Sequence, residues 1–516
     1  MSLAAAENAR LRPDEIALAD ERAELGWAAL DGMLNRGVNA LLAREAPTFG
    51  RVAVFAHNSV ETVIAYLSAL LAGVSSVPAS FHLTAEELAY ILKDSGADTL
   101  FVGPETREVG RAAAALAGVD RVVGWRCEAA PGLIGWDDWL AAARAEEPSA
   151  DLPPRPQLHY TSGTTGRPKG TETPPNMFPR GRTVAEVVET LRETRRSLGD
   201  RSPVMVVGPL YHTGPLGAVR QLAAGASVVL LSRFDPEAVL RTIQAYRVKS
   251  TVMVPTHFQR LLSLSETIRA KYDVSSLVAV SHTGAACPPE VKRRMIDWFG
   301  PVLIEAYGAT ESGTTNTITS EEWLRKPGSV GRTVAPFEPV VVAEDGQRLG
   351  PGEQGQLYFR DTTGRGIVYH NDPEKTRAAH LEPGVFTLGE VGYVDDEGYV
   401  FITDRVSDMI VSGGVNIYPA EAEQVLLQHP GVTDVAVIGA PNAEMGEEAK
   451  ALVVPANAAA PPDPEALDRF CRVRLAGYKC PRSYAFVADL GRNAMGKINK
   501  RELRRPYWPT GRTIGG

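Results

Sequence analysis

The stretch YTSGTTGRPKG, residues 160–170, contains three glycines, four Ser or Thr hydroxyls and two cations. No hydrophobic period fits it, which predicts a loop, and the preceding run Gln157–Tyr160 predicts a strand that leads into it. Glycines let backbone N–H groups approach a ligand closely, and hydroxyls, N–H groups and cations together suit phosphate. Pro168 stands where a Walker A loop has glycine before its lysine, so this is a different kind of phosphate loop. A polar surface loop is the alternative.

The length and composition indicate a globular protein of two or more domains. A chain of 516 residues exceeds what one hydrophobic core holds, and its 44% hydrophobic and 22% charged residues are ordinary for soluble proteins. The net charge of −8 argues against nucleic acid as a partner, because phosphate backbones require a basic surface. The four cysteines are scattered without metal-ligand spacing, so a reducing cytoplasm is the expected location.

Neither a signal peptide nor a transmembrane segment is expected. Met1–Asp20 contains early acidic residues and no sustained apolar core. Residues 62–85 carry no Asp, Glu, Lys or Arg, but their strongly apolar part, Val63–Gly73, is about half of the ~20 residues that a membrane span requires. This segment is expected to be a buried helix that leads into a strand.

A second motif, YGATES at residues 307–312, follows the short apolar run Leu303–Ala306. Tyr307 offers a flat face to adenine, Thr310 offers a hydroxyl to phosphate, and Glu311 offers a hard oxygen to Mg²⁺. A Tyr-Gly turn beside a strand is the alternative interpretation.

Taken in order along the chain, these motifs resemble those of the adenylate-forming superfamily, and most resemble bacterial acyl-CoA and aryl-CoA synthetases. SHTGAA at 281–286, TDRVSDMI at 403–410 and NAMGKINK at 493–500 extend the match. The resemblance covers essentially the whole chain, with at least five motifs in the order of the family.

The resemblance implies an α/β fold with two domains. The large N-terminal domain, residues 1–404, would contain covered parallel and mixed sheets divided into subdomains. Strand-like and helical runs alternate in residues 1–150, as expected of a covered parallel sheet. A hinge at 405–407 and a small mobile α/β domain at 408–516 would follow.

The resemblance also implies the residues that bind Mg·ATP. The turn at 281–286 would lie against adenine, Thr310 against the α-phosphate, and Glu311 would hold the metal. Lys497, on a glycine-containing loop, would stabilise adenylation, with a surface lysine as the alternative. The implied nucleotide-binding residues are Thr161, Ser162, Gly163, Thr164, Thr165, Gly166, Lys169, Gly284, Ala285, Ala286, Tyr307, Gly308, Glu390 and Arg405, and the implied catalytic residues are Lys497, Thr310, Glu311 and His212.

The acid site and the CoA tunnel are implied in the same way. His212, in the motif PLYHTG, would gate the acyl pocket, with a satisfied polar histidine as the alternative. Arg220 would be a polar anchor in that pocket, and a side chain that reaches solvent is an equally good interpretation. Gly414 would lie beside pantetheine, and Ser407 would be the hinge residue. The implied acid-binding residues are His212, Arg220, His257, His282 and Gly308.

Two positions depart from the family pattern. Glu390 stands where the family has an aspartate that hydrogen-bonds both ribose hydroxyls. The glutamate side chain is one methylene longer, so its carboxylate must take a different orientation to reach the ribose. After Gly170 the chain continues with TETPP, where the family often continues toward a Ser-His pair. Neither departure touches Lys497 or Glu311, so catalysis is still expected.

The expected activity has two steps. A carboxylic acid reacts with Mg·ATP to give acyl-AMP and pyrophosphate, and the thiol of CoA then displaces AMP. The polar side chains implied for the pocket favour a small or aromatic acid. Two alternatives stay open: adenylation with another acceptor or an unusual acid, such as a carrier protein or nitrite, and a nucleotide-binding protein with little turnover. The oligomeric state is open, with a homodimer as one candidate.

Overall fold

The structure of this chain is a computed structural model. It describes residues 3–43, 50–128, 130–161, 168–343, 345–405, 408–412, 415–442, 445–475, 477–493 and 496–508. Some predicted site positions lie outside the described residues, and for them the assignments stay predictions: Ser162, Gly163, Thr164, Thr165, Gly166, Ser407, Gly414 and the side chain of Arg405.

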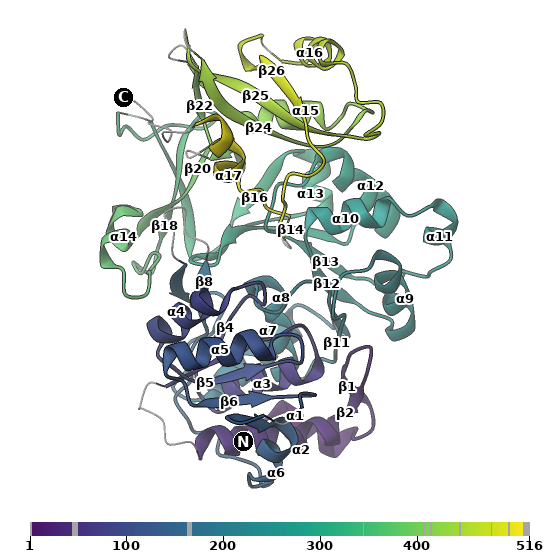
Figure 1. Ribbon diagram of the computed structural model, residues 1–516, viewed down its shortest axis with the longest axis vertical. Helices are drawn as coiled ribbons and strands as arrows, with labels where there is room; N and C mark the ends of the chain where they lie inside the picture. Colours follow the sequence, from purple (N-terminus) through teal and green to yellow (C-terminus); the bar gives the residue numbers. More distant parts are fainter. Residues whose placement is uncertain are drawn as a thin grey trace.

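The N-terminal part of the chain contains a five-stranded parallel sheet flanked by helices, as predicted (Figure 1). The uncharged segment forms α3 (Val60–Leu71), which begins where Ser59 accepts a hydrogen bond from the Thr62 N–H and which is buried along most of its length. No helix in the described part of the chain is long and apolar enough to cross a membrane. The strands, in sheet order, are β4 (Ser76–Pro78), β3 (Arg51–Phe55), β5 (Ala97–Val102), β6 (Arg121–Gly124) and β7 (Leu133–Gly135).

A fourteen-stranded mixed sheet carries the predicted motifs. Six of its strands run parallel, in the order β14 (Leu303–Ala309), β13 (Ala279–His282), β12 (Ser250–Met253), β10 (Val204–Val206), β11 (Val228–Leu230) and β1 (Ile16–Ala19). Because parallel strands present their carboxyl ends at one edge, the segments that follow β10, β12, β13 and β14 meet there. The antiparallel part continues from β14 through β15 (Gly313–Thr319), β16 (Ser329–Thr333), β21 (Tyr399–Arg405), β20 (Val385–Val394), β18 (Gly355–Asp361) and β17 (Phe337–Val342).

Both ends of the stretch 160–170, which was predicted as a loop, belong to strands: Tyr160 and Thr161 end β8 (Leu158–Thr161), and Lys169 and Gly170 begin β9 (Lys169–Glu172). Tyr307, Gly308 and Ala309 complete β14, and Ser329–Gly331 opens β16. A Cβ atom added to Gly331 would lie 1.9 Å from the carbonyl oxygen of Thr317. The glycine therefore marks a close approach between strands at a β-bulge, which a local pattern cannot distinguish from a loop.

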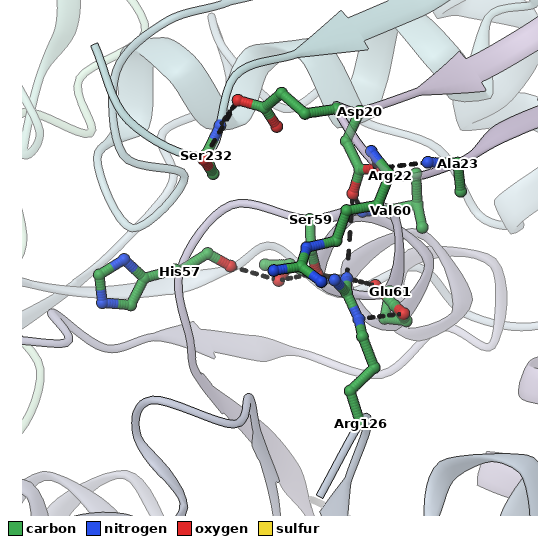
Figure 2. Close-up of polar contacts among 11 residues, drawn as sticks. Asp20, Arg22, Ala23, His57, Ser59, Val60, Glu61, Arg126 and Ser232 are labelled. Atoms are coloured by element: carbon green, nitrogen blue, oxygen red, sulfur yellow. Dashed lines mark hydrogen bonds and ion pairs between the residues drawn. The ribbon is translucent and has the colours of Figure 1, made fainter. Parts of the chain in front are cut away.

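A polar network connects the two larger sheets of the large domain (Figure 2). Asp20, directly after β1, accepts a hydrogen bond of 3.0 Å from the N–H of Val60 at the start of α3. Arg126, beyond β6, pairs with Glu61 in α3 and lies 3.9 Å from the Asp20 carboxylate. Since a carboxylate at a helix N-terminus is favourable, the network fixes α3 relative to the large sheet.

The C-terminal part forms a separate five-stranded sheet, at the end of the molecule opposite the N-terminal sheet in Figure 1. Arg504, in α17 (Lys500–Arg504), donates to the carboxylate of Asp408 at 3.0 Å. This pair attaches the first described residue after the predicted hinge to α17. The sheet contains β23 (Val415–Ile417), β22 (Ile410–Ser412), β25 (Gly446–Pro455), β24 (Val432–Asn442) and β26 (Ser483–Phe486), packed with α15 (Pro419–Leu426) and α16 (Pro464–Arg472).

Candidate active site

The two strongest sequence motifs meet at the carboxyl edge of the large sheet. Thr161 ends β8 (Leu158–Thr161), and its hydroxyl donates to the Glu311 carboxylate at 3.1 Å, although 150 residues separate them. The hydroxyl of Thr213, the first residue of α8 (Thr213–Ala223), lies 3.4 Å from that of Thr310. Hydroxyls and a carboxylate from three separate segments therefore converge.

The phosphate-loop lysine already has a partner in the protein. Lys169 begins β9 (Lys169–Glu172), which pairs with β8, and its Nζ lies 2.8 Å from the carboxylate of Asp372. This ion pair borders a cavity of about 360 Å³ that Tyr90 and Asp94 also line. A phosphate that binds Lys169 therefore has to compete with Asp372.

Two glycines of the predicted nucleotide site have positive φ angles. A Cβ atom added to Gly308 would lie 2.0 Å from the carbonyl oxygen of Gly313, so only glycine fits at this bulge between β14 and β15. Gly284, in the turn after β13, has a φ of +89°. The positive φ of Gly284 favours glycine in the predicted adenine turn, whereas the glycine at 308 is required by the close approach of the neighbouring strand.

The substituted position Glu390 lies inside β20, opposite Arg405 in the register with β21. It is 7% exposed, so its longer side chain is accommodated within the protein rather than directed into solvent. The carboxylate that Glu390 provides at this position is therefore buried.

His212 and Lys497 come close together from distant parts of the chain. His212 precedes α8, and burial, followed by the positive charge of Lys497, lowers the pKa of its imidazole to about 4. The imidazole is therefore neutral near pH 7. The segment between β26 and α17, which descends toward β14 in Figure 1, carries Lys497.

The loop that carries Lys497 packs against the large domain through a glycine. A Cβ atom added to Gly496 would lie 2.7 Å from Cγ2 of Thr256, and the φ of Gly496 is +71°. Within the small domain, Arg492 donates to the Gly496 carbonyl at 2.6 Å and pairs with Asp434. The loop is therefore held at its base and contacts the large domain at its tip.

Replacing Gly496 with alanine is expected to lower adenylation ~10-fold or more, because the methyl group adds both left-handed backbone strain and a clash with Thr256. ATP–pyrophosphate exchange measures this loss. CoA-dependent release of AMP from added acyl-AMP should change little. Thr256→Ala in the Gly496→Ala background removes the clashing atoms and should restore part of the exchange. Unchanged exchange in Gly496→Ala would show that this contact does not serve adenylation.

Two further histidines predicted for the acid pocket are buried, and of these only His257 has a hydrogen-bond partner among the described residues, since both ring nitrogens of His282 lack one. The ring of His257 stacks on Phe234 with centroids 4.0 Å apart, and its Nδ1 accepts a hydrogen bond of 3.4 Å from the Val254 N–H. His282 is fully buried, with Nε2 3.7 Å from Oε2 of Glu305. Burial lowers the pKa of His257 to about 3 and that of His282 well below its ordinary value, so both are neutral.

Arg220 does not reach solvent, so that sequence-based alternative is wrong. It lies in α8 and is 7% exposed.

The sequence-based reasoning missed Asp372 and Tyr369. Burial and the nearby Glu311 carboxylate raise the pKa of the Tyr369 phenol, which places this residue beside the predicted metal ligand. Asp372 followed by Pro373 is a recognisable helix start, and α14 (Pro373–Ala378) does begin there. Nothing local indicates that Asp372 would meet a lysine 203 residues earlier.

Two family models match this chain. The family model for AMP-binding enzymes matches residues 5–366, and the model for the AMP-binding enzyme C-terminal domain matches residues 421–497. A feruloyl-CoA synthase from an Amycolatopsis species is 35% identical over 97% of both chains. An indoleacetate–CoA ligase from Aromatoleum aromaticum is 31% identical over 96% of both.

Solved structures show the same fold. The o-succinylbenzoate CoA synthetase from Bacillus subtilis, in complex with its acyl-adenylate intermediate, aligns with a TM-score of 0.77 and 27% identity. The alignment covers 100% of this chain and 99% of that one. The chain belongs to the AMP-binding enzymes, within the adenylate-forming superfamily that includes the acyl-CoA synthetases.

Proposed function

We propose that this protein is an AMP-forming acid–CoA ligase. It converts a carboxylic acid and Mg·ATP to acyl-AMP and then transfers the acyl group to CoA. The observation that carries the proposal is the packing of Gly496 on Thr256, which brings Lys497 beside His212 at the edge where Thr213 meets Thr310. Full-length relatives named as CoA ligases support the same activity.

In the first step, a carboxylate oxygen of the acid attacks the α-phosphorus of ATP. The bond to the bridging oxygen of the β-phosphate breaks, and pyrophosphate leaves with that electron pair. No general base is needed, because a carboxylic acid is already ionised near pH 7. Lys497, Thr161 and Thr310 stabilise the charge that develops, together with the phosphate loop.

Glu311 is the proposed ligand of the Mg²⁺ that accompanies ATP. No group of three or more His, Cys, Asp or Glu side chains in the described parts of the chain could hold a metal. Mg²⁺ is commonly bound by one or two carboxylates together with substrate phosphates, so a single carboxylate beside a threonine hydroxyl fits it. The ion would neutralise phosphate charge.

In the second step, the small domain rotates about residues 405–407 so that Lys497 leaves and Gly414 approaches the thiol of CoA. The thiolate attacks the acyl carbon, and AMP leaves. Because Arg504 holds Asp408 to α17, we place the start of the rotating unit at residue 408 and the large domain at 1–404. Both co-substrates, ATP and CoA, are available in the cytoplasm, which is the proposed location.

The deciding test is ATP–pyrophosphate exchange with a panel of aryl, short-chain, long-chain and dicarboxylic acids and nitrite, followed by AMP release with and without CoA. Exchange with an acid, and AMP release that rises with CoA, support the ligase. Exchange with an acid, together with AMP release that does not rise with CoA, would mean that the acyl group is transferred to another acceptor. ATP binding without exchange for any acid would contradict the proposed function.

A further inference from the structure

The side of α8 that faces the catalytic threonines carries little side-chain bulk. Beside Thr213, a Cβ atom added to Gly214 would lie 3.4 Å from Val252 in β12. One turn later, a Cβ atom added to Gly217 would have only one described atom within 4 Å outside the helix backbone, Nη2 of Arg220 at 3.6 Å. Because glycine has no side chain, these two positions leave space beside the helix. Glycine in a helix interior is also less stable than alanine, so this space has a cost in helix stability.

Arg220 points its guanidinium along this glycine side of α8. The residue is 7% exposed, and it makes no side-chain hydrogen bond or ion pair with any residue that the structure describes. Its Nη1 is buried without a partner. Burial lowers the pKa of the guanidinium to about 10, so it still carries its charge at neutral pH. A buried charge without a partner is strongly unfavourable, which indicates a partner from outside the protein.

The ionisable neighbour of Arg220 does not supply a negative charge. His159, in β8, is 3% exposed, and its Nε2 is hydrogen-bonded with the hydroxyl of Thr173 at 3.0 Å. Burial, then the charges of Arg220 and His212, lower the pKa of His159 to about 3, so its imidazole is neutral. Arg220 therefore lies beside neutral polar groups, in a position that accepts an anion.

We infer that Arg220 binds a second carboxylate on the substrate, so that the activated acid is a dicarboxylic acid. This inference rests on the proposed function, which places the reacting carboxylate near Thr213 and Thr310. Four residues of helix separate Thr213 from Gly217, a rise of ~6 Å, and Nη2 of Arg220 lies beside Gly217, 3.6 Å from its Cβ position. The two carboxylates would thus be ~6–10 Å apart. A linear diacid of roughly six to nine carbons, or a benzene-1,4-dicarboxylate, spans that distance.

The test compares matched acids in ATP–pyrophosphate exchange: adipate, suberate and terephthalate against hexanoate, octanoate and 4-methylbenzoate. The wild-type protein is expected to prefer at least one diacid over its matched monoacid by ~10- to 100-fold in kcat/KM, the value of a hydrogen bond to a charged group. Arg220→Met should abolish that preference and raise the KM for the diacid. Its KM for ATP should stay unchanged. Arg241→Met, at an exposed arginine of α9 (Pro236–Tyr246), is the control and should keep the preference.

Each contrary outcome has a distinct meaning. Equal use of every diacid and its monoacid by the wild-type protein would overturn the inference and leave the ligase standing. If Arg220→Met raises the KM for ATP and keeps the preference for the diacid, then the anion that Arg220 binds belongs to the nucleotide. That result would also overturn the inference. Absence of exchange with every acid would overturn the proposed function together with this inference. If Arg220→Met does not fold, the wild-type preference and Arg220→Lys decide the question.

Discussion

Replacing Lys497 with alanine is expected to lower ATP–pyrophosphate exchange by at least ~10²-fold, comparable to the loss of one oxyanion-hole donor. The lysine lies close enough to His212 for its charge to contribute to the low pKa of that buried imidazole. A cation in this position stabilises the negative charge that develops on the α-phosphate when the acid attacks. The alanine variant loses that stabilisation in the transition state and should show a lower kcat.

The same variant should still catalyse the second step. Supplied with acyl-AMP and CoA, Lys497→Ala should form the thioester at close to the wild-type rate, because Lys497 leaves the site before the thiol attacks. Lys93→Ala, at an exposed lysine of α4 (Ala85–Ser95), is the control and should behave as wild type in both assays. Normal pyrophosphate exchange in Lys497→Ala would remove the lysine from the mechanism.

Local signals in the sequence predicted much of the fold. The uncharged segment was predicted as a buried helix and is α3, which begins at the N-cap residue Ser59. These features depend on residues within one or two turns of each other, so they can be recognised without the tertiary structure. The strand pairing of Tyr160 with Gly170 was missed because the glycines and polar residues of this stretch carry no hydrophobic period.

The sequence predicted which motifs form the site. It did not predict which side chains of these motifs contact one another. The motifs around Thr161 and Glu311 were identified separately, and the structure brings them within 3.1 Å. The partner of Lys169 and the isolation of Arg220 follow only from tertiary packing. A single-residue pattern cannot show whether a charge inside a protein has a counter-ion.

Breaking the buried pair Lys292–Glu305 is expected to be strongly destabilising, because it leaves a buried charge without its counter-ion. Lys292, in α12 (Pro289–Phe299), is fully buried, and its Nζ lies 2.5 Å from the carboxylate of Glu305 in β14 and 4.8 Å from the ring centre of Trp323. Glu305→Met leaves the lysine charge buried without its partner. The expected cost is ~3–5 kcal/mol of unfolding free energy.

The double variant Lys292→Met/Glu305→Met should be more stable than Glu305→Met alone, because it removes both charges and leaves apolar side chains of similar size. Urea unfolding followed by tryptophan fluorescence measures the effect, with Trp323 as a local reporter beside Lys292. The control is Arg348→Met, which breaks a pair with Glu382 whose side chains are 52% and 47% exposed, and it should cost a small fraction as much. Since Glu305 pairs in register with His282, which belongs to the predicted adenine turn at 281–286, Glu305→Met should also raise the KM for ATP. Equal stability of Glu305→Met and Arg348→Met would mean that the buried lysine is solvated or paired in another way.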